Sequence, residues 1–137
     1  MGSVTLIDDM VGRIVDMLEE RGLMDNTLIV FITDHGEMMF ERGRLGKGNF
    51  NEAVIRVPLV VVPPGGSAAP RKVEGLVEIF DIAPTVLDYA VAEIPATMSA
   101  SSLRPIVEGW CAGKDMVLTE YVINDWSYRG ICVRADR

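Results

Sequence analysis

Residues 27–33, which read T-L-I-V-F-I-T, constrain the fold of this chain more than any other segment. The run is rich in β-branched and aromatic residues and shows no polar alternation, which is typical of a parallel strand buried on both faces. A central strand of this kind needs neighbouring strands on both sides. We therefore expect an α/β fold with helices on both faces of a mostly parallel sheet.

Polar residues follow this strand at once. Asp34 and His35 fall at its carboxyl end, where open α/β sheets bind their ligands, and Gly36 lets the chain turn. A carboxylate oxygen and a neutral imidazole nitrogen can both reach one divalent ion. The alternative stays open from these residues alone: Asp34 would cap the next segment, and His35 would make a surface hydrogen bond.

A glycine-rich loop comes next and carries a lysine. Gly43, Gly46 and Gly48 bracket Lys47, and such a loop lets the backbone and an ammonium group approach a bound anion closely. Lys47 is therefore a candidate contact for an oxyanion. A solvated surface lysine is the competing interpretation, and Arg42 carries a similar one as a surface or ion-pair residue.

Three stretches resemble the C-terminal half of the catalytic domain of the sulfatase family, which belongs to the alkaline phosphatase superfamily. They read T-D-H-G-E-M, E-R-G-R-L-G-K-G-N-F-N-E and I-R-V-P-L-V-V. The similarity continues through F-D-I-A-P-T-V-L-D-Y-A and S-L-R-P-I-V-E-G and includes the first helix. It covers nearly the whole chain, so we expect residues 1–137 to be one C-terminal portion of such a domain.

The resemblance implies roles for four residues. Asp34 and His35 would be ligands of a divalent ion, with calcium or manganese expected, and Lys47 would contact the oxygens of a sulfate or phosphonate ester. Arg42 would be a weaker substrate contact. The Glu41-Arg42 pair is similar to the choline-sulfatase branch, and Asp-His at the ligand positions is similar to the choline-sulfatase and phosphonate-hydrolase branches.

One part of the family's apparatus is missing. Its nucleophile lies in a Cys/Ser-x-Pro-x-Arg motif, where the Cys or Ser is oxidised to formylglycine, and residues 1–137 contain no such motif. The family's N-terminal Asp pair is also unmatched, because Asp8 and Asp9 resemble its helix residues. The resemblance therefore implies a fragment without the N-terminal half, inactive alone, whose parent enzyme hydrolyses sulfate esters. An open sheet edge would make this fragment prone to self-association.

Two alternatives to a sulfatase remain. A phosphonate monoester or phosphodiester hydrolase of the same superfamily would use similar Asp-His and Lys positions. A non-catalytic α/β module or remnant would keep the fold, and its metal affinity would be the quantity to measure.

Composition limits the partners and the compartment. With 13 basic and 20 acidic side chains the net charge is -7, which disfavours nucleic acid and anionic membranes as partners. An anionic substrate would need a local positive patch. Cys111 and Cys132 match no zinc spacing and are expected to be free buried thiols. No signal peptide or membrane span is visible, and the choice between cytoplasm and periplasm stays open.

Apolar spacing, together with Gly, Pro and helix-capping residues, predicts the remaining helices and strands. Apolar residues at helical spacing predict a first helix that ends at Gly22 and packs on the sheet. Asp81 is expected to cap a helix that runs through about Ala92. Further strands are expected at 57–62, 116–123 and 130–134, with a Pro/Gly loop at 63–70 and an aromatic segment, Trp126 and Tyr128, at 124–128.

Overall fold

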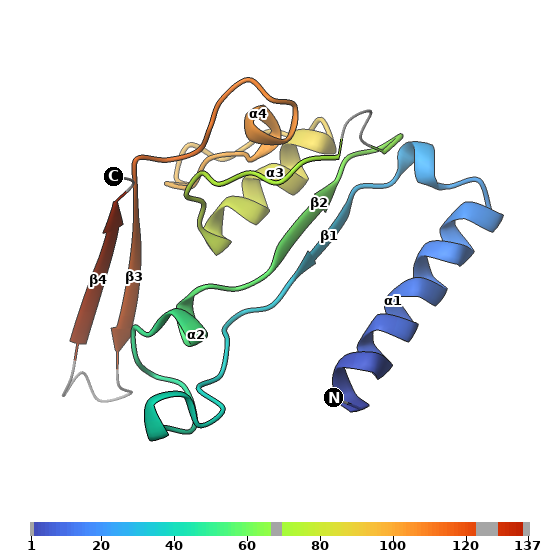
Figure 1. The fold of residues 1–137 in the computed structure, drawn as a ribbon. Helices are drawn as coiled ribbons and strands as arrows, with labels where there is room; N and C mark the ends of the chain where they lie inside the picture. Colours follow the sequence, from blue (N-terminus) through green and yellow to red (C-terminus); the bar gives the residue numbers. More distant parts are fainter. Residues whose placement is uncertain (1, 67–69, 123–128, 136–137) are drawn as a thin grey trace.

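The computed structural model describes residues 2–66, 70–122 and 129–135 (Figure 1). Its helices and strands, in chain order, are α1 (Gly2–Glu20), β1 (Ile29–Ile32), α2 (Glu52–Ile55), β2 (Leu59–Val62), α3 (Ile82–Tyr89), α4 (Arg104–Val107), β3 (Met116–Val122) and β4 (Arg129–Ala135). Short 3₁₀ helices occupy Met24–Asn26, Glu41–Gly43 and Ile79–Asp81. Each strand predicted from the sequence is present, whereas α2 and α4 were not predicted. The aromatic segment 124–128 lies outside the described residues.

Both strand pairings are antiparallel. β1 pairs with β2 in a register that sets Ile29 opposite Val62, and β3 pairs with β4 so that Tyr121 faces Gly130. The predicted parallel order is therefore not found among the described strands. β1 is also not buried on both faces within this chain, because Phe31 is 39% exposed. The apolar run predicted the strand correctly, but it could not predict the direction of the partner strand.

Helix α1 ends as its sequence predicts. Gly22 adopts a left-handed conformation with φ of 64°, and its N–H donates to the Glu19 carbonyl. The next N–H, from Leu23, donates to the Leu18 carbonyl, which completes a Schellman motif. The predicted packing of this helix on the sheet is only partial among the described residues, because α1 has no fully buried residue and only Val11, Val15 and Leu18 are half-buried. Its apolar stripe, which includes Ile7 and Ile14, is exposed.

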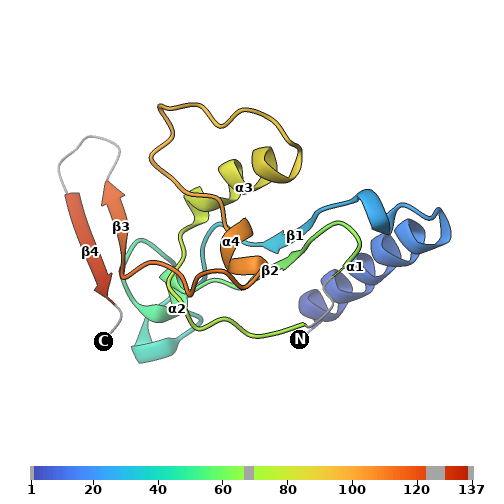
Figure 2. The same ribbon diagram turned by 90° about the horizontal axis from the view of Figure 1, so that it is seen from above.

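The helices lie on opposite sides of the β1–β2 ribbon. Figure 1 and Figure 2 show α1 on one side of this ribbon and α3 on the other, with the β3–β4 hairpin set apart beyond α2. The described core is small and centres on four apolar side chains, which are Met38, Val54, Leu103 and Ile106. Contacts between buried apolar side chains therefore connect only some of the helices and strands.

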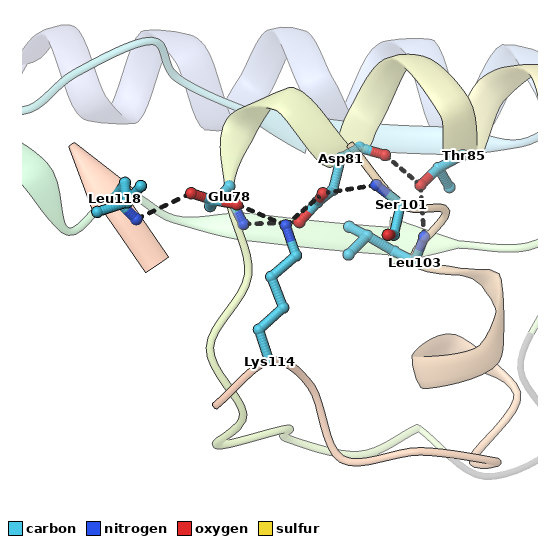
Figure 3. Close-up of polar contacts among 7 residues, drawn as sticks. All are labelled: Glu78, Asp81, Thr85, Ser101, Leu103, Lys114 and Leu118. Atoms are coloured by element: carbon cyan, nitrogen blue, oxygen red, sulfur yellow. Dashed lines mark hydrogen bonds and ion pairs between the residues drawn. The ribbon is translucent and has the colours of Figure 1, made fainter. Parts of the chain in front are cut away.

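A buried polar network supplies much of the remaining attachment (Figure 3). The Asp81 side chain is fully buried and accepts hydrogen bonds from the Ser101 N–H at 3.1 Å and from the Lys114 ammonium at 2.7 Å. Lys114 also donates to Glu78 at 2.5 Å. Glu78 accepts from the backbone N–H of Leu118 in β3 at 2.9 Å. The network thus joins the start of α3, the segment after it and the β3–β4 hairpin.

Asp81 does not cap α3 in the predicted way. It lies at the N-cap position, but its side chain makes no capping hydrogen bond to that helix. The carboxylate instead accepts the backbone N–H of Glu78 at 2.9 Å, which closes the 3₁₀ turn before α3. The other carboxylate oxygen, Oδ1, accepts the long-range contacts from Lys114 and Ser101, and no local pattern encodes them. The helix itself is shorter than predicted and ends at Tyr89.

The electrostatics of Lys114 agree with an ion pair. Partial burial lowers the pKa of its ammonium group, but the hydrogen bonds that it donates to Asp81 and Glu78 raise it by more, so the net shift is upward. Lys114 is therefore charged at neutral pH. A buried carboxylate that loses such a partner is left with an uncompensated charge.

The cysteines are free, as predicted, but they are not buried. Cys111 is exposed and Cys132 is half-buried. Cys132 lies in β4, a strand that has only one partner among the described residues. No helix in the described ranges is long and apolar enough to span a membrane.

We predict that Asp81→Ala will lower the free energy of unfolding by about 3 kcal/mol, because the change removes the buried carboxylate that pairs with Lys114. Urea unfolding followed by circular dichroism measures this. The control is Glu74→Ala, which removes an exposed ion pair with Lys72 and should change the midpoint little. Equal midpoints for the two variants would contradict a stabilising role for the network.

Candidate metal and oxyanion site

The candidate site begins where β1 ends. The Asp34 carboxylate accepts the backbone N–H of His35 at 2.9 Å and lies 3.4 Å from the Thr33 hydroxyl. That hydroxyl also donates to the His35 carbonyl at 3.3 Å. These bonds hold the turn that brings two successive side chains to the same side of the strand end.

The His35 ring is oriented by its own neighbour. Its Nδ1 lies 2.9 Å from the Gly36 carbonyl, so Nδ1 carries the hydrogen and donates it. Nε2 then presents its lone pair, and the Lys47 ammonium lies 2.5 Å from it. The second Asp34 oxygen lies 3.5 Å from the same Nε2. The structure therefore brings Asp34, His35 and Lys47 together, although Lys47 is distant from the other two in sequence.

A closed loop accounts for this proximity. The backbone N–H of Met38 donates to the Gly46 carbonyl at 3.1 Å, which joins the two ends of the loop. The Met38 side chain is only 1% exposed and anchors the loop in the core. Lys47 therefore emerges beside His35. Nothing in the sequence singled out Met38, because Met39 and Phe40 beside it are equally apolar but exposed, and the loop has no helical or strand periodicity.

Gly36 is required for close packing and not for a turn. Its φ is not in the left-handed region. A Cβ at this position would lie 1.9 Å from the carbonyl oxygen of Ala53. The Gly36 N–H also donates to the Val54 carbonyl at 2.8 Å. Gly36 thus fixes the end of β1 against α2.

The loop also contains strained backbone. Met39, Phe40 and Arg42 have positive φ values of 39°, 69° and 53°. Such conformations in residues other than glycine cost about 1 kcal/mol or more each and persist where the surroundings hold them in place. Arg42 does not line the hollow that contains Asp34, His35 and Lys47. Its contact with substrate therefore stays a prediction, because Arg42 does not lie beside the other candidate residues.

The charges suit a cation beside His35. The pKa of Asp34 is lowered: desolvation raises it, but the hydrogen bonds from the His35 backbone N–H and from the Thr33 hydroxyl help to lower it by more. The carboxylate is 83% exposed and ionised at neutral pH. The Lys47 ammonium already occupies the position of a cation at Nε2. Carboxylate and imidazole therefore form a donor pair that fits a divalent ion.

This donor pair is incomplete by itself. In the part of the chain that the structure describes, no group of three or more His, Cys, Asp and Glu side chains gathers around one point. Protein-bound calcium takes about six to eight oxygen ligands, so Asp34 and His35 would supply only part of a coordination shell. Further ligands would be water, substrate, backbone or amide oxygens, or side chains of another part of the protein.

The site opens into a large hollow. Its volume is about 2070 Å³, and it extends from β1 and β2 to the β3–β4 hairpin. Pockets for small ligands usually measure about 300–1,000 Å³, so the hollow is too large to be a substrate pocket alone. Asp34, His35 and Lys47 occupy one end of it together with Tyr121, which sequence reasoning did not identify.

Comparison with known proteins identifies the class. The family model described as Sulfatase matches residues 1–92. The chain is 36% identical over 110 residues to an arylsulfatase from Clostridium perfringens, an alignment that covers 78% of this chain and 23% of the relative. It is also 36% identical over 122 residues to a choline-sulfatase from Rhizobium meliloti, covering 87% of this chain and 23% of the relative.

Solved structures agree with this class. A protein in complex with its substrate D-glucosamine-2-N,6-O-disulfate superimposes with a TM-score of 0.85 and 28% identity, covering 96% of this chain and 28% of that one. The phosphonate monoester hydrolase from Silicibacter pomeroyi gives a TM-score of 0.79 and 35% identity, covering 85% of this chain and 23% of that one. This chain belongs to the sulfatase family, and its α/β fold class is confirmed. It spans less than a quarter of the length of the two curated relatives.

We predict that Gly36→Ala will lower the free energy of unfolding by about 2 kcal/mol, because the new methyl group would overlap the Ala53 carbonyl. It should also shift the NMR signals of the ring of His35, the only histidine in the chain. The matched control is Gly12→Ala in α1, where an added Cβ would have no atom within 4 Å. This substitution should stabilise the helix by up to about 1 kcal/mol, because alanine has a higher helix propensity than glycine. If both substitutions raised stability, the close packing at Gly36 would be refuted.

Proposed function

We propose that this chain forms part of a sulfatase-type hydrolase that cleaves sulfate esters. Asp34 and His35 would hold a divalent ion, calcium or manganese, and Lys47 would contact the oxyanion of the substrate. The observation that carries this proposal is the convergence of the three side chains at the carboxyl end of β1, with Nε2 of His35 lying 2.5 Å from Lys47 and 3.5 Å from Asp34.

Each residue has a distinct role in this proposal. Asp34 contributes a charged oxygen, and the Gly36 carbonyl holds His35 in the tautomer whose Nε2 is free to coordinate. Lys47 would leave Nε2 when an ion binds there, because one lone pair cannot serve both cations. Its ammonium group would then stabilise negative charge on the oxygens of the ester.

The ion, when bound, supplies charge neutralisation and activation of a nucleophile. Residues 1–137 contain no Cys/Ser-x-Pro-x-Arg motif, so we assign the formylglycine nucleophile to sequence outside these residues. The proposal therefore expects the 137-residue chain to be inactive alone and to act as one portion of a catalytic domain. Its apolar surfaces, such as the exposed stripe of α1, favour association with further protein.

A second substrate class has a specific observation in its favour. The phosphonate monoester hydrolase is 35% identical to this chain, which is higher than the 28% of the structure solved with a disulfated sugar. Sulfate and phosphonate groups both place oxygens within reach of one ammonium group and one ion. We retain sulfate esters as the leading class because two of the curated relatives are named as sulfatases.

Manganese provides a direct test of the ligand pair. We expect Mn²⁺ to broaden the NMR signals of the His35 ring, with a dissociation constant on the order of 0.1 mM or weaker, because only part of the coordination shell is present. Asp34→Ala should weaken the binding by about tenfold or more. Calcium should restore sharp signals by competition, provided that it uses the same site.

The control for this experiment is Asp9→Ala, which removes an exposed carboxylate of α1 and should leave the broadening unchanged. It also tests the Asp8-Asp9 pair as an alternative metal site. Sub-micromolar Mn²⁺ binding that Asp34→Ala does not alter would refute the proposed site.

The substrate proposal is tested with anions. We expect inorganic sulfate and methylphosphonate to perturb the His35 signals of the metal-loaded chain, and Lys47→Ala to weaken both by about tenfold. The anion with the lower dissociation constant indicates whether the substrate is a sulfate ester or a phosphonate ester. We also expect no hydrolysis of an aryl sulfate or a phosphonate monoester by the purified chain, and measurable turnover would contradict an external nucleophile.

A further inference from the structure

Tyr121 lines the hollow and has no role in the proposed function. It lies near the end of β3 and is half-buried, on the same face of the strand as Val117 and Thr119. It lines the hollow together with Asp34, His35 and Lys47, and it lies beside Gly48, the residue that follows Lys47. Gly130 lies opposite it in β4, so no cross-strand side chain competes for the space beside the ring.

The ring packs directly against the loop that carries Lys47. Gly48 follows Lys47 and has a left-handed φ of 83°. A Cβ at Gly48 would lie 2.8 Å from the Tyr121 hydroxyl oxygen and 3.0 Å from Cζ, which is closer than side chains tolerate. The tyrosine ring can therefore occupy this position only because residue 48 is a glycine.

The same hairpin touches the loop segment at a second point. Arg134 of β4 forms an ion pair with Glu52, the first residue of α2. The hydrogen bond from Arg134 is the main cause that lowers the pKa of Glu52. Arg134 faces Val117 in the strand register, four residue pairs from Tyr121, which is about 13 Å along the hairpin. Two separate contacts fix both the position and the orientation of the segment from Gly48 to Glu52.

We propose that Tyr121 is a positioning residue for Lys47. It holds the backbone at Gly48, so the ammonium group of Lys47 stays beside Nε2 of His35 and within reach of an anion. A lysine side chain has a long flexible stem, and its head group is placed only as well as its backbone is fixed. This inference rests on the proposed function of Lys47, but the contact between Lys47 and His35 can be measured independently of anion binding.

The test uses the 137-residue chain and its single histidine. At a fixed, mildly alkaline pH, the ¹⁵N shift of His35 Nε2 reports the Lys47 contact. Lys47→Ala should move this signal, and Tyr121→Ala should move it most of the way to the same value. Tyr121→Phe keeps the ring and should move it much less. Tyr121→Ala combined with Lys47→Ala should add nothing to Lys47→Ala alone.

Leu118→Ala is the matched control. Leu118 lies on the opposite, exposed face of β3, so its truncation tests whether any damage to the hairpin gives the same shift. The control should leave the Nε2 signal unchanged. A purely structural role for Tyr121 would shift the signal in the Lys47→Ala background as well, and this would overturn the proposal. An Nε2 signal that is unmoved by either Tyr121→Ala or Lys47→Ala would overturn it too.

Anion and metal binding separate this inference from the proposed function. Tyr121→Ala should weaken inorganic sulfate binding about tenfold, while Mn²⁺ broadening of the His35 signals should be at least as strong as in the unchanged chain, because a displaced Lys47 no longer competes for Nε2. If the unchanged chain bound neither sulfate nor Mn²⁺, the proposed function would fail, and the Nε2 shifts would still decide the role of Tyr121. If the unchanged chain bound sulfate and Tyr121→Ala bound it equally well, the inference alone would fail.

Discussion

The buried carboxylate of Asp81 joins segments that few apolar contacts hold together. It accepts hydrogen bonds from Ser101 and Lys114, and Glu78 extends the network to the backbone of β3 (Figure 3). Because the described core is small, the position of the β3–β4 hairpin depends on this network. The hairpin in turn carries Tyr121, whose ring contacts Gly48. A structural ion pair thus determines the surface against which the Lys47 loop packs.

The loop between β1 and α2 combines strain with attachment. Three residues other than glycine have positive φ values there. These conformations raise the free energy of the folded state relative to the unfolded chain, in which the residues are free to adopt favourable φ values. Burial of Met38 and its hydrogen bond to Gly46 offset part of the cost, and the close approach of Gly36 to Ala53 fixes the near end. A loop held at this many points presents Lys47 in one arrangement. Such fixed placement is what binding of a small anion requires.

Local patterns in the sequence predicted the strands and the end of α1 at Gly22, and both are confirmed because a few adjacent residues carry the physical cause, such as a glycine at a left-handed position. The polar residues after the apolar run led to Asp34 and His35, and the glycine-rich loop led to Lys47; the structure places these three side chains close together, and their roles stay predictions. Local patterns fail where the cause is a distant contact. Asp81 was expected to cap α3 because Lys114 could not be anticipated, and Tyr121 contacts Gly48, which is far from it in sequence. The direction of strand pairing is likewise a property of the whole chain.

The contact between Lys47 and His35 links the metal and anion roles that we propose for the site. Nε2 has one lone pair, so an ammonium group at 2.5 Å and a metal ion are mutually exclusive there. Binding of an ion would therefore displace Lys47 toward the open hollow, where an anionic ester would meet both positive charges. The net charge of -7 makes this local concentration of positive charge important, because the overall field repels an anion. A displaced lysine is useful only if its backbone stays in place, and this is the physical reason for a tyrosine packed against the residue that follows it.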